Sequence, residues 1–104
     1  MEKITFGNKT IISTDFSDFE TAWKIDDSLL VLEYLKSKNK IVLGGDILTE
    51  KLEHNYDNWY YDTDSNQNHK TNVEQGFKTA YEYISNYIKL NGTTFFVVIV
   101  TKEL

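Results

Sequence analysis

The longest regular pattern of apolar positions in the chain lies in its last third and has the period of a helix. Seven apolar residues recur there at spacings of three and four, with charged or polar residues between them: Val73, Phe77, Ala80, Tyr81, Ile84, Tyr87 and Ile88. Thr71 and Glu74 have the spacing of a capping box, and Asn91 with Gly92 forms a stop signal. The pattern predicts an amphipathic helix from about Thr71 to Asn91.

Two shorter helices are expected near the N-terminus. Ser17 and Glu20 have capping-box spacing, and the residues that follow predict a short helix with one apolar face formed by Phe19, Ala22 and Trp23. A second helix is expected from Asp26 or Asp27 to about Lys36. One continuous helix would spread its apolar residues over too much of its circumference, so the pattern favours a break near residues 25–27 or, alternatively, a helix buried on two sides.

The other apolar stretches are short and typical of strands. Residues 3–6 and 9–14 alternate weakly around Gly7-Asn8, a hairpin-turn signal, so they form a hairpin or a single frayed strand. Ile41–Leu48 predicts one strand with a bulge at Gly44-Gly45, or a place where a neighbouring ring or backbone comes close. Residues 49–57 and 62–72 are polar and predict loops.

Two more strands are expected on either side of the long helix. In the strand at residues 58–62, Trp59 and Tyr61 are predicted to face inward and Tyr60 outward, although the opposite phase is the alternative. The strand at residues 94–102 has a continuous apolar run, which predicts a central position covered on both faces or nearly so.

These elements predict an α+β fold in a single domain over residues 1–104. The expected architecture has two layers: a mostly antiparallel sheet of three to five strands, with helices packed on one face. The alternative is that the last helix is the crossover of a β-α-β unit, which makes the final strand parallel to its neighbour.

The charge balance narrows the classes of partner. The chain carries 16 acidic and 11 basic residues, a formal net charge of −5, which disfavours nucleic acid and anionic membranes and favours a basic partner. All the basic residues are lysines, and the absence of arginine weighs against phosphate readout. The absence of cysteine excludes disulfides and thiolate metal sites and fits a reducing cytoplasm. The longest apolar run, residues 95–100, is far too short to span a bilayer.

No motif in the sequence supports catalysis, a metal or a cofactor. The series Asp62, Asp64, Asn66 and Asn68 resembles the start of a calcium loop, but Gln67 replaces the required glycine and Glu74 is one position late. His54 and His69 fall in predicted polar loops without metal-ligand spacing. Gly44-Gly45-Asp46 lacks the pattern of a phosphate loop. We therefore expect no catalytic residue, no metal and no cofactor.

The two central strands instead combine acids with aromatic residues. Rigid aromatic side chains provide contact area and carboxylates provide charge complementarity, which suits the recognition of a basic protein surface. Trp59 and Tyr61 fall in the same stretch but are expected to be core. The predicted contact residues are Asp46, Glu50, Glu53, Tyr56, Asp57, Tyr60, Asp62 and Asp64.

Three segments in order resemble those of a small bacterial immunity protein: Ala22-Trp23, residues 41–48 (IVLGGDIL) and residues 56–61 (YDNWYY). The resemblance runs from about Phe19 to Thr101 and is to the immunity protein 40 family. It implies an α+β protein that binds and neutralises a co-encoded toxin in the producing cell, without catalysis or a cofactor.

Four residues match the family only as signature positions: Gly44, Gly45, Asp46 and Trp59. The glycines would leave room for the Trp59 ring on the neighbouring strand. Two other functions remain open from the residues themselves. One is a protein- or peptide-binding adaptor unrelated to toxins, and the other is a small enzyme or ligand-binding domain.

Overall fold

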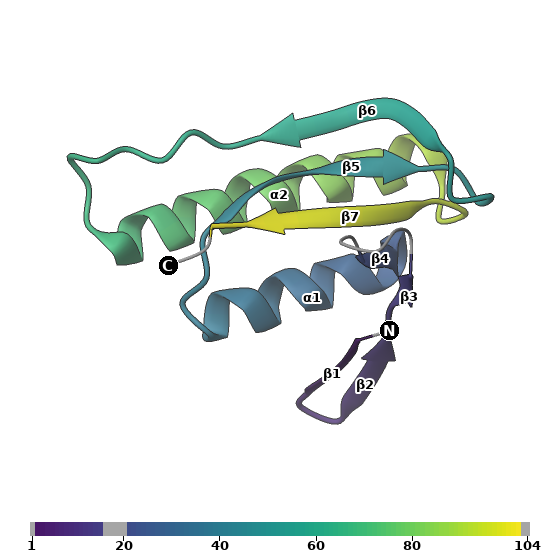
Figure 1. The fold of residues 1–104 in the computed structure, drawn as a ribbon, viewed down its shortest axis with the longest axis horizontal. Coiled ribbons are helices and arrows are strands. Elements are labelled where there is room, and N and C mark those ends of the chain that lie inside the picture. Colours follow the sequence, from purple (N-terminus) through teal and green to yellow (C-terminus); the bar gives the residue numbers. More distant parts are fainter. Residues whose placement is uncertain (1, 16–20, 103–104) are drawn as a thin grey trace.

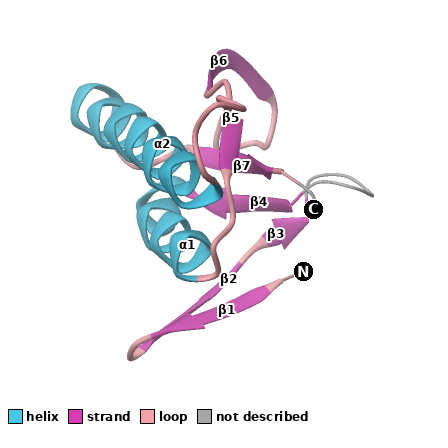
Figure 2. Cartoon of the chain, turned by 90° about the vertical axis from the view of Figure 1, so that its left-hand side faces the viewer, coloured by secondary structure: helices cyan, strands magenta, loops and turns pink. Residues whose placement is uncertain are grey.

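The computed structural model describes residues 2–15 and 21–102 (Figure 1). Nine elements follow one another along this part of the chain: β1 (Lys3–Phe6), β2 (Lys9–Ile12), β3 (Thr14–Asp15), β4 (Thr21–Lys24), α1 (Ile25–Ser37), β5 (Val42–Leu48), β6 (His54–Tyr60), α2 (His69–Asn91) and β7 (Phe96–Thr101). The described helices are antiparallel neighbours on one face of the main sheet (Figure 2). The fold class is therefore α+β, as predicted.

The main sheet has the strand order β3-β4-β7-β5-β6, and every neighbouring pair is antiparallel. The alternative of a final strand parallel to its neighbour is therefore wrong. Because β6 and β7 each run antiparallel to β5, they are parallel to each other, and α2 connects them across β5. By the same logic α1 connects β4 to β5 across β7. Each helix thus covers the sheet between the two strands that it joins.

The N-terminal hairpin is confirmed. β1 and β2 pair antiparallel in register from Lys3 with Ile12 to Phe6 with Lys9. The buried side chains of Ile4 and Ile11 pack with Trp23 and with Val31 of α1. The hairpin therefore covers the side of α1 that faces away from α2 (Figure 2).

The predicted short helix around Ala22 and Trp23 is wrong, because these residues lie in β4. Ala22 pairs with Val98 and Trp23 with Val97 of β7, and both are buried. Pairing with a strand more than 70 residues away overrides the local helical preference. The capping pair at Ser17 and Glu20, together with Phe19, lies outside the described residues.

The helix α1 runs without interruption from Ile25 to Ser37 and is buried on two sides, and the predicted break near residues 25–27 coincides with the change from β4 to α1. Leu32 packs in the core between the helices and the sheet, whereas Val31 packs against the hairpin. Asp26 and Asp27 are not the N-cap, which is Lys24. They lie in the first turn, where carboxylates interact favourably with the helix dipole.

The starts of β6 and α2 also differ from the predictions. Strand β6 begins at His54, inside the predicted loop 49–57, because a bulge lets the strand pair further back. Helix α2 begins at His69 and not at Thr71. Its N-cap is Asn68, whose side-chain oxygen accepts a hydrogen bond from the Thr71 N–H at 2.8 Å. The end of α2 at Asn91, with Gly92 at φ +89°, is as predicted.

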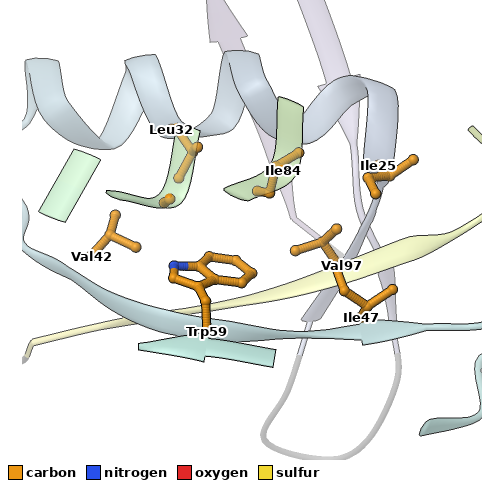
Figure 3. Close-up of a cluster of buried hydrophobic side chains, with 8 residues drawn as sticks. Ile25, Leu32, Val42, Ile47, Trp59, Ile84 and Val97 are labelled. Atoms are coloured by element: carbon orange, nitrogen blue, oxygen red, sulfur yellow. The ribbon is translucent and has the colours of Figure 1, made fainter. Parts of the chain in front are cut away.

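The core between the helices and the sheet is built around Trp59 of β6. Figure 3 shows the indole lying between Val42 and Val97, with Leu32 and Ile84 from the two helices nearby. The ring also stacks on Tyr83 of α2, with ring centroids 5.1 Å apart. Its indole N–H is buried without a hydrogen-bond partner among the described residues. Because such an orphan costs about 1–3 kcal/mol, the packing of the ring must outweigh that penalty.

The glycine pair of β5 makes room on both faces of the sheet. Gly45 lies opposite Trp59, and a Cβ at this position would come within 2.5 Å of the indole ring. Gly44 points to the other face at φ +153°, and a Cβ there would lie 2.3 Å from the Trp59 carbonyl oxygen. The strand bulges between Val42 and Gly44, where Leu43 is an extra residue relative to β7. Both positions therefore require glycine, because atoms of β6 approach the β5 backbone too closely for a side chain.

We expect the substitution Gly44→Val to lower the free energy of unfolding by at least about 2 kcal/mol. The change adds a clash with the β6 backbone and places a β-branched residue at a positive φ. Chemical denaturation measures the loss. Val100→Thr is the control, since Val100 is an exposed neighbour on the same face and should change the stability by no more than about 0.5 kcal/mol. Equal stability of the Gly44 variant would contradict this packing.

Candidate functional site

The face of the main sheet that points away from the helices has a regular arrangement over β6, β5 and β7. We call it the open face. The register places two rows of residues across these three strands: Asn58, Asp46 and Val98 in one row, and Tyr60, Gly44 and Val100 in the next. Val98 is buried, whereas Tyr60 is 75% and Val100 is 45% exposed. The prediction that the last strand is covered on both faces is therefore confirmed at Val97 and Val98 but is wrong at Val100.

A hollow of about 280 Å³ lies in the second row. We call it the Gly44 hollow. Gly44 is buried at the level of the backbone and supplies no side chain, so the space between the side chains of Tyr60 and Val100 is empty. Leu43, Asp46 and Asn58 also line it. The side chains of Asp46 and Asn58 make no hydrogen bond or ion pair with any residue that the structure describes.

The first half of β6 contains a bulge that displays Tyr56. Asp46 pairs with Asn58 and Leu48 with His54, so three residues of β6 lie opposite Ile47 alone. Tyr56, in the middle of the bulge, has φ +60° and is 93% exposed. A positive φ is strained for a bulky residue, and such strain clusters at functional sites. The bulge is therefore a candidate contact region.

Tyr87 of α2 holds the two residues that flank Tyr56. Its hydroxyl donates a hydrogen bond to Oδ2 of Asp57 at 2.8 Å and accepts one from Nδ2 of Asn55 at 2.7 Å. Burial, followed by the hydrogen bond to Asp57 and the negative charge of Asp57, raises the pKa of Tyr87 to about 12. The hydroxyl thus stays protonated and keeps the bulge attached to the helix.

The loop after β6 is held by a different side chain of α2. Asn72, which is buried, accepts hydrogen bonds from the Tyr61 hydroxyl at 2.6 Å and from the Asp64 N–H at 3.1 Å. Asp64 in turn accepts one from the Asn66 N–H at 2.8 Å. The series Asp62 to Asn68 is therefore an Asx-rich turn packed against the start of α2.

In strand β6 itself, Trp59 points inward and Tyr60 outward, which is the predicted phase.

The predicted contact acids do not form a single cluster. Glu50 and Glu53 lie in the turn before β6, where Thr49 and Glu53 are joined by a backbone hydrogen bond. Asp62 and Asp64 lie beyond the other end of the strand, and at about 3.3 Å per residue the two groups are roughly 25–30 Å apart. All four are exposed. Of the eight predicted contact residues, the Gly44 hollow contains only Asp46 and Tyr60.

Sequence reasoning missed several residues of these two features. Val100 and Asn58 line the hollow, but a continuous apolar run gave no sign that Val100 would be exposed. Asn55 and Tyr87 hold the bulge, but they are 32 residues apart and only the fold brings them together. The detectable signal for the hollow was the glycine pair itself, which marks a close approach of backbone or ring.

The described residues contain no group of three or more histidine, cysteine, aspartate or glutamate side chains placed to hold a metal ion. Among the helices that the structure describes, none is long and apolar enough to cross a membrane.

The Tyr87 contacts lead to a prediction about alkaline pH. Because the pKa is raised from about 10 in the unfolded chain to about 12 in the fold, the stabilisation is complete below pH 10. It is lost as the pH rises from about 10 to 12. The absorbance of tyrosinate is titrated in the wild type and in the Tyr87→Phe variant, and the difference between the two curves should have its midpoint near pH 12. The same titration in denaturant, with a midpoint near 10, is the control. Asp57→Asn should lower the Tyr87 midpoint toward 10, and an unchanged midpoint would contradict the role of Asp57.

A comparison with protein families identifies the chain. The model of immunity protein 40 matches residues 11–101, which covers both helices and all strands from β3 onward. No curated protein and no solved structure gave a significant match. The match includes the glycine pair, Trp59 and the open face, and it agrees with the resemblance of the sequence segments. The chain belongs to the immunity protein 40 family.

Proposed function

We propose that this chain neutralises its cognate toxin by binding it with the open face and the β6 bulge, which together form an acidic surface rich in aromatic residues. Membership of the immunity family implies toxin neutralisation without catalysis, so the inhibition works by binding alone. The proposed site of action is the cytoplasm of the producing cell, and the proposed partner is a basic protein.

The observation that carries this proposal is the exposure of large side chains on the open face and on the β6 bulge. Tyr56 and Tyr60 are 93% and 75% exposed, and Val100 beside them is 45% exposed. Tyrosine is enriched among residues that dominate binding energy at protein interfaces. Two of these side chains flank the Gly44 hollow, and the third lies on a bulge that Tyr87 fixes in place. Because Tyr87 holds the residues on both sides of Tyr56, the backbone of the bulge loses little conformational entropy on binding.

The charge of the chain supports a basic partner. The formal net charge is −5, and the acids proposed for contact extend along the whole length of β6: Asp46, Glu50, Glu53, Asp57, Asp62 and Asp64. Charges spread over a surface in this way accelerate encounter with a partner of opposite charge more than they tighten the final complex. We therefore assign the acids at the two ends of β6 (Glu50, Glu53, Asp62 and Asp64) mainly to attraction and the tyrosines mainly to affinity.

The function is tested directly by co-expressing the chain with the toxin encoded beside it. Growth should be rescued, and the two proteins should purify as a complex. Absence of rescue together with absence of a complex would refute toxin neutralisation.

Truncation of the exposed tyrosines should separate binding from folding. We expect Tyr60→Ala and Tyr56→Ala each to weaken toxin binding by about tenfold or more, with a change in unfolding free energy within about 0.5 kcal/mol. Tyr81→Ala is the matched control, because Tyr81 is a partly exposed tyrosine on α2. Isothermal titration calorimetry gives the affinities. If the Tyr60 variant binds with full affinity and only the Tyr81 control loses affinity, the toxin contacts the helices and not the open face.

Salt should slow the association of the two proteins. If carboxylates attract a basic toxin, the association rate constant should fall steeply as the ionic strength rises, while the dissociation rate constant changes little. Stopped-flow mixing measures both rates. The double substitution Glu50→Gln and Glu53→Gln should make the association rate less dependent on salt. An association rate independent of salt would contradict electrostatic attraction.

A further inference from the structure

We propose that the Gly44 hollow binds one lysine or arginine side chain of the toxin, with its aliphatic stem between Tyr60 and Val100 and its cationic group beside Asp46. This inference rests on the proposed function and assigns a specific chemical partner to one part of the surface.

The width of the hollow follows from the strand register. Tyr60, Gly44 and Val100 are direct neighbours across three strands, and adjacent strands lie about 4.8 Å apart. The backbones that carry Tyr60 and Val100 are therefore about 10 Å apart, and the position between them has no side chain. The gap has room for one extended aliphatic chain but not for an aromatic ring lying flat across the strands.

The chemistry of the hollow changes along its length. Its sides are the Tyr60 ring and the Val100 methyl groups, which suit the methylene groups of a long side chain. Asp46 lies two residues from Gly44 on the same strand face, about 7 Å away along β5. Asp46 is a half-buried residue whose carboxylate has no partner among the described residues, and Asn58 is its neighbour on β6. A stem that enters beside Tyr60 thus reaches a carboxylate and an amide oxygen within its own length.

A cationic occupant fits better than the other classes of side chain. A purely apolar side chain would cover Asp46 without pairing it, which leaves a desolvated carboxylate and costs binding energy. An acidic side chain would meet the same carboxylate with like charge. A lysine or arginine pairs with it and also places its methylene groups against the Tyr60 ring. Among the described residues, no lysine lines the Gly44 hollow itself.

Two substitutions test the two halves of the inference without touching Gly44. Asp46→Asn removes the charge while keeping the size, and Val100→Phe fills the gap from its exposed side. Glu33→Gln on α1 and Ile12→Phe on β2 are the matched controls, since they make the same changes at exposed positions elsewhere. Calorimetric titration with the purified toxin encoded beside this chain should show at least tenfold weaker binding for each test variant and less than twofold change for each control.

A double-mutant cycle identifies the occupant. Each lysine and arginine of the toxin is changed to methionine, which keeps the stem and removes the charge. One of these substitutions should weaken binding to the wild type but not to the Asp46→Asn variant, as expected when the two lost groups interact. If every toxin substitution weakens binding to both proteins equally, the inference is overturned.

The outcomes separate this inference from the proposed function. A toxin that fails to bind the wild type refutes the proposed function. A toxin that binds the wild type, the Asp46 variant and the Val100 variant equally well refutes only the hollow as a binding site. If only the Asp46 variant loses affinity, the inference is also refuted, because the carboxylate would then contribute to binding although no toxin side chain occupies the gap. If Val100→Phe does not fold, Val100→Leu fills part of the gap and gives the same comparison.

Discussion

The contact between the Trp59 indole and Gly45 is the constraint on which the rest of the sheet depends. The ring occupies the space that a side chain at residue 45 would fill, and there it contacts both β5 and the underside of α2. Stacking on Tyr83 then fixes the position of α2 relative to β6. Tyr83 stacks in turn on Tyr87, with ring centroids 6.1 Å apart. The side chain that fills the core is thereby linked to the one that holds the β6 bulge.

The glycine pair shapes the two faces of the sheet in opposite ways. On the helix side, the missing side chain of Gly45 is replaced by the Trp59 ring, and the space is filled. At Gly44 the close approach of the β6 backbone leaves no room for a Cβ, and a hollow remains on the open face between Tyr60 and Val100. Because successive residues of a strand point to opposite faces, two adjacent glycines can serve the core and the surface at the same time. A change at Gly44 therefore affects stability, whereas contact with a partner is better tested at its neighbours.

Much of the fold was predictable, and the errors have a common origin. The N-terminal hairpin, the length of α2 and its end at Gly92 follow from turn chemistry and helical period, which act within a few residues. Ala22 and Trp23 were wrongly predicted as helical because their pairing partners, Val98 and Val97, are distant in the chain. The start of β6 was misplaced because its bulge is stabilised by Tyr87 of α2, some 30 residues later. Of the candidate site, Asp46 and Tyr60 were named in advance, while Asn58 and Val100 were not.

The sequence by itself determined the α+β class, the acidic charge, the family resemblance and the residue types available for binding. These depend on composition, short-range periodicity and segment order, all of which are properties of the chain alone. Only the tertiary structure decided which of those residues meet. It separated the acids at the two ends of β6 by the length of the strand, brought Val100 beside Tyr60, and left Asp46 without a partner among the described residues. The physical reason is that a strand register is set by packing across the whole sheet, and a shift of one residue would turn every side chain to the other face.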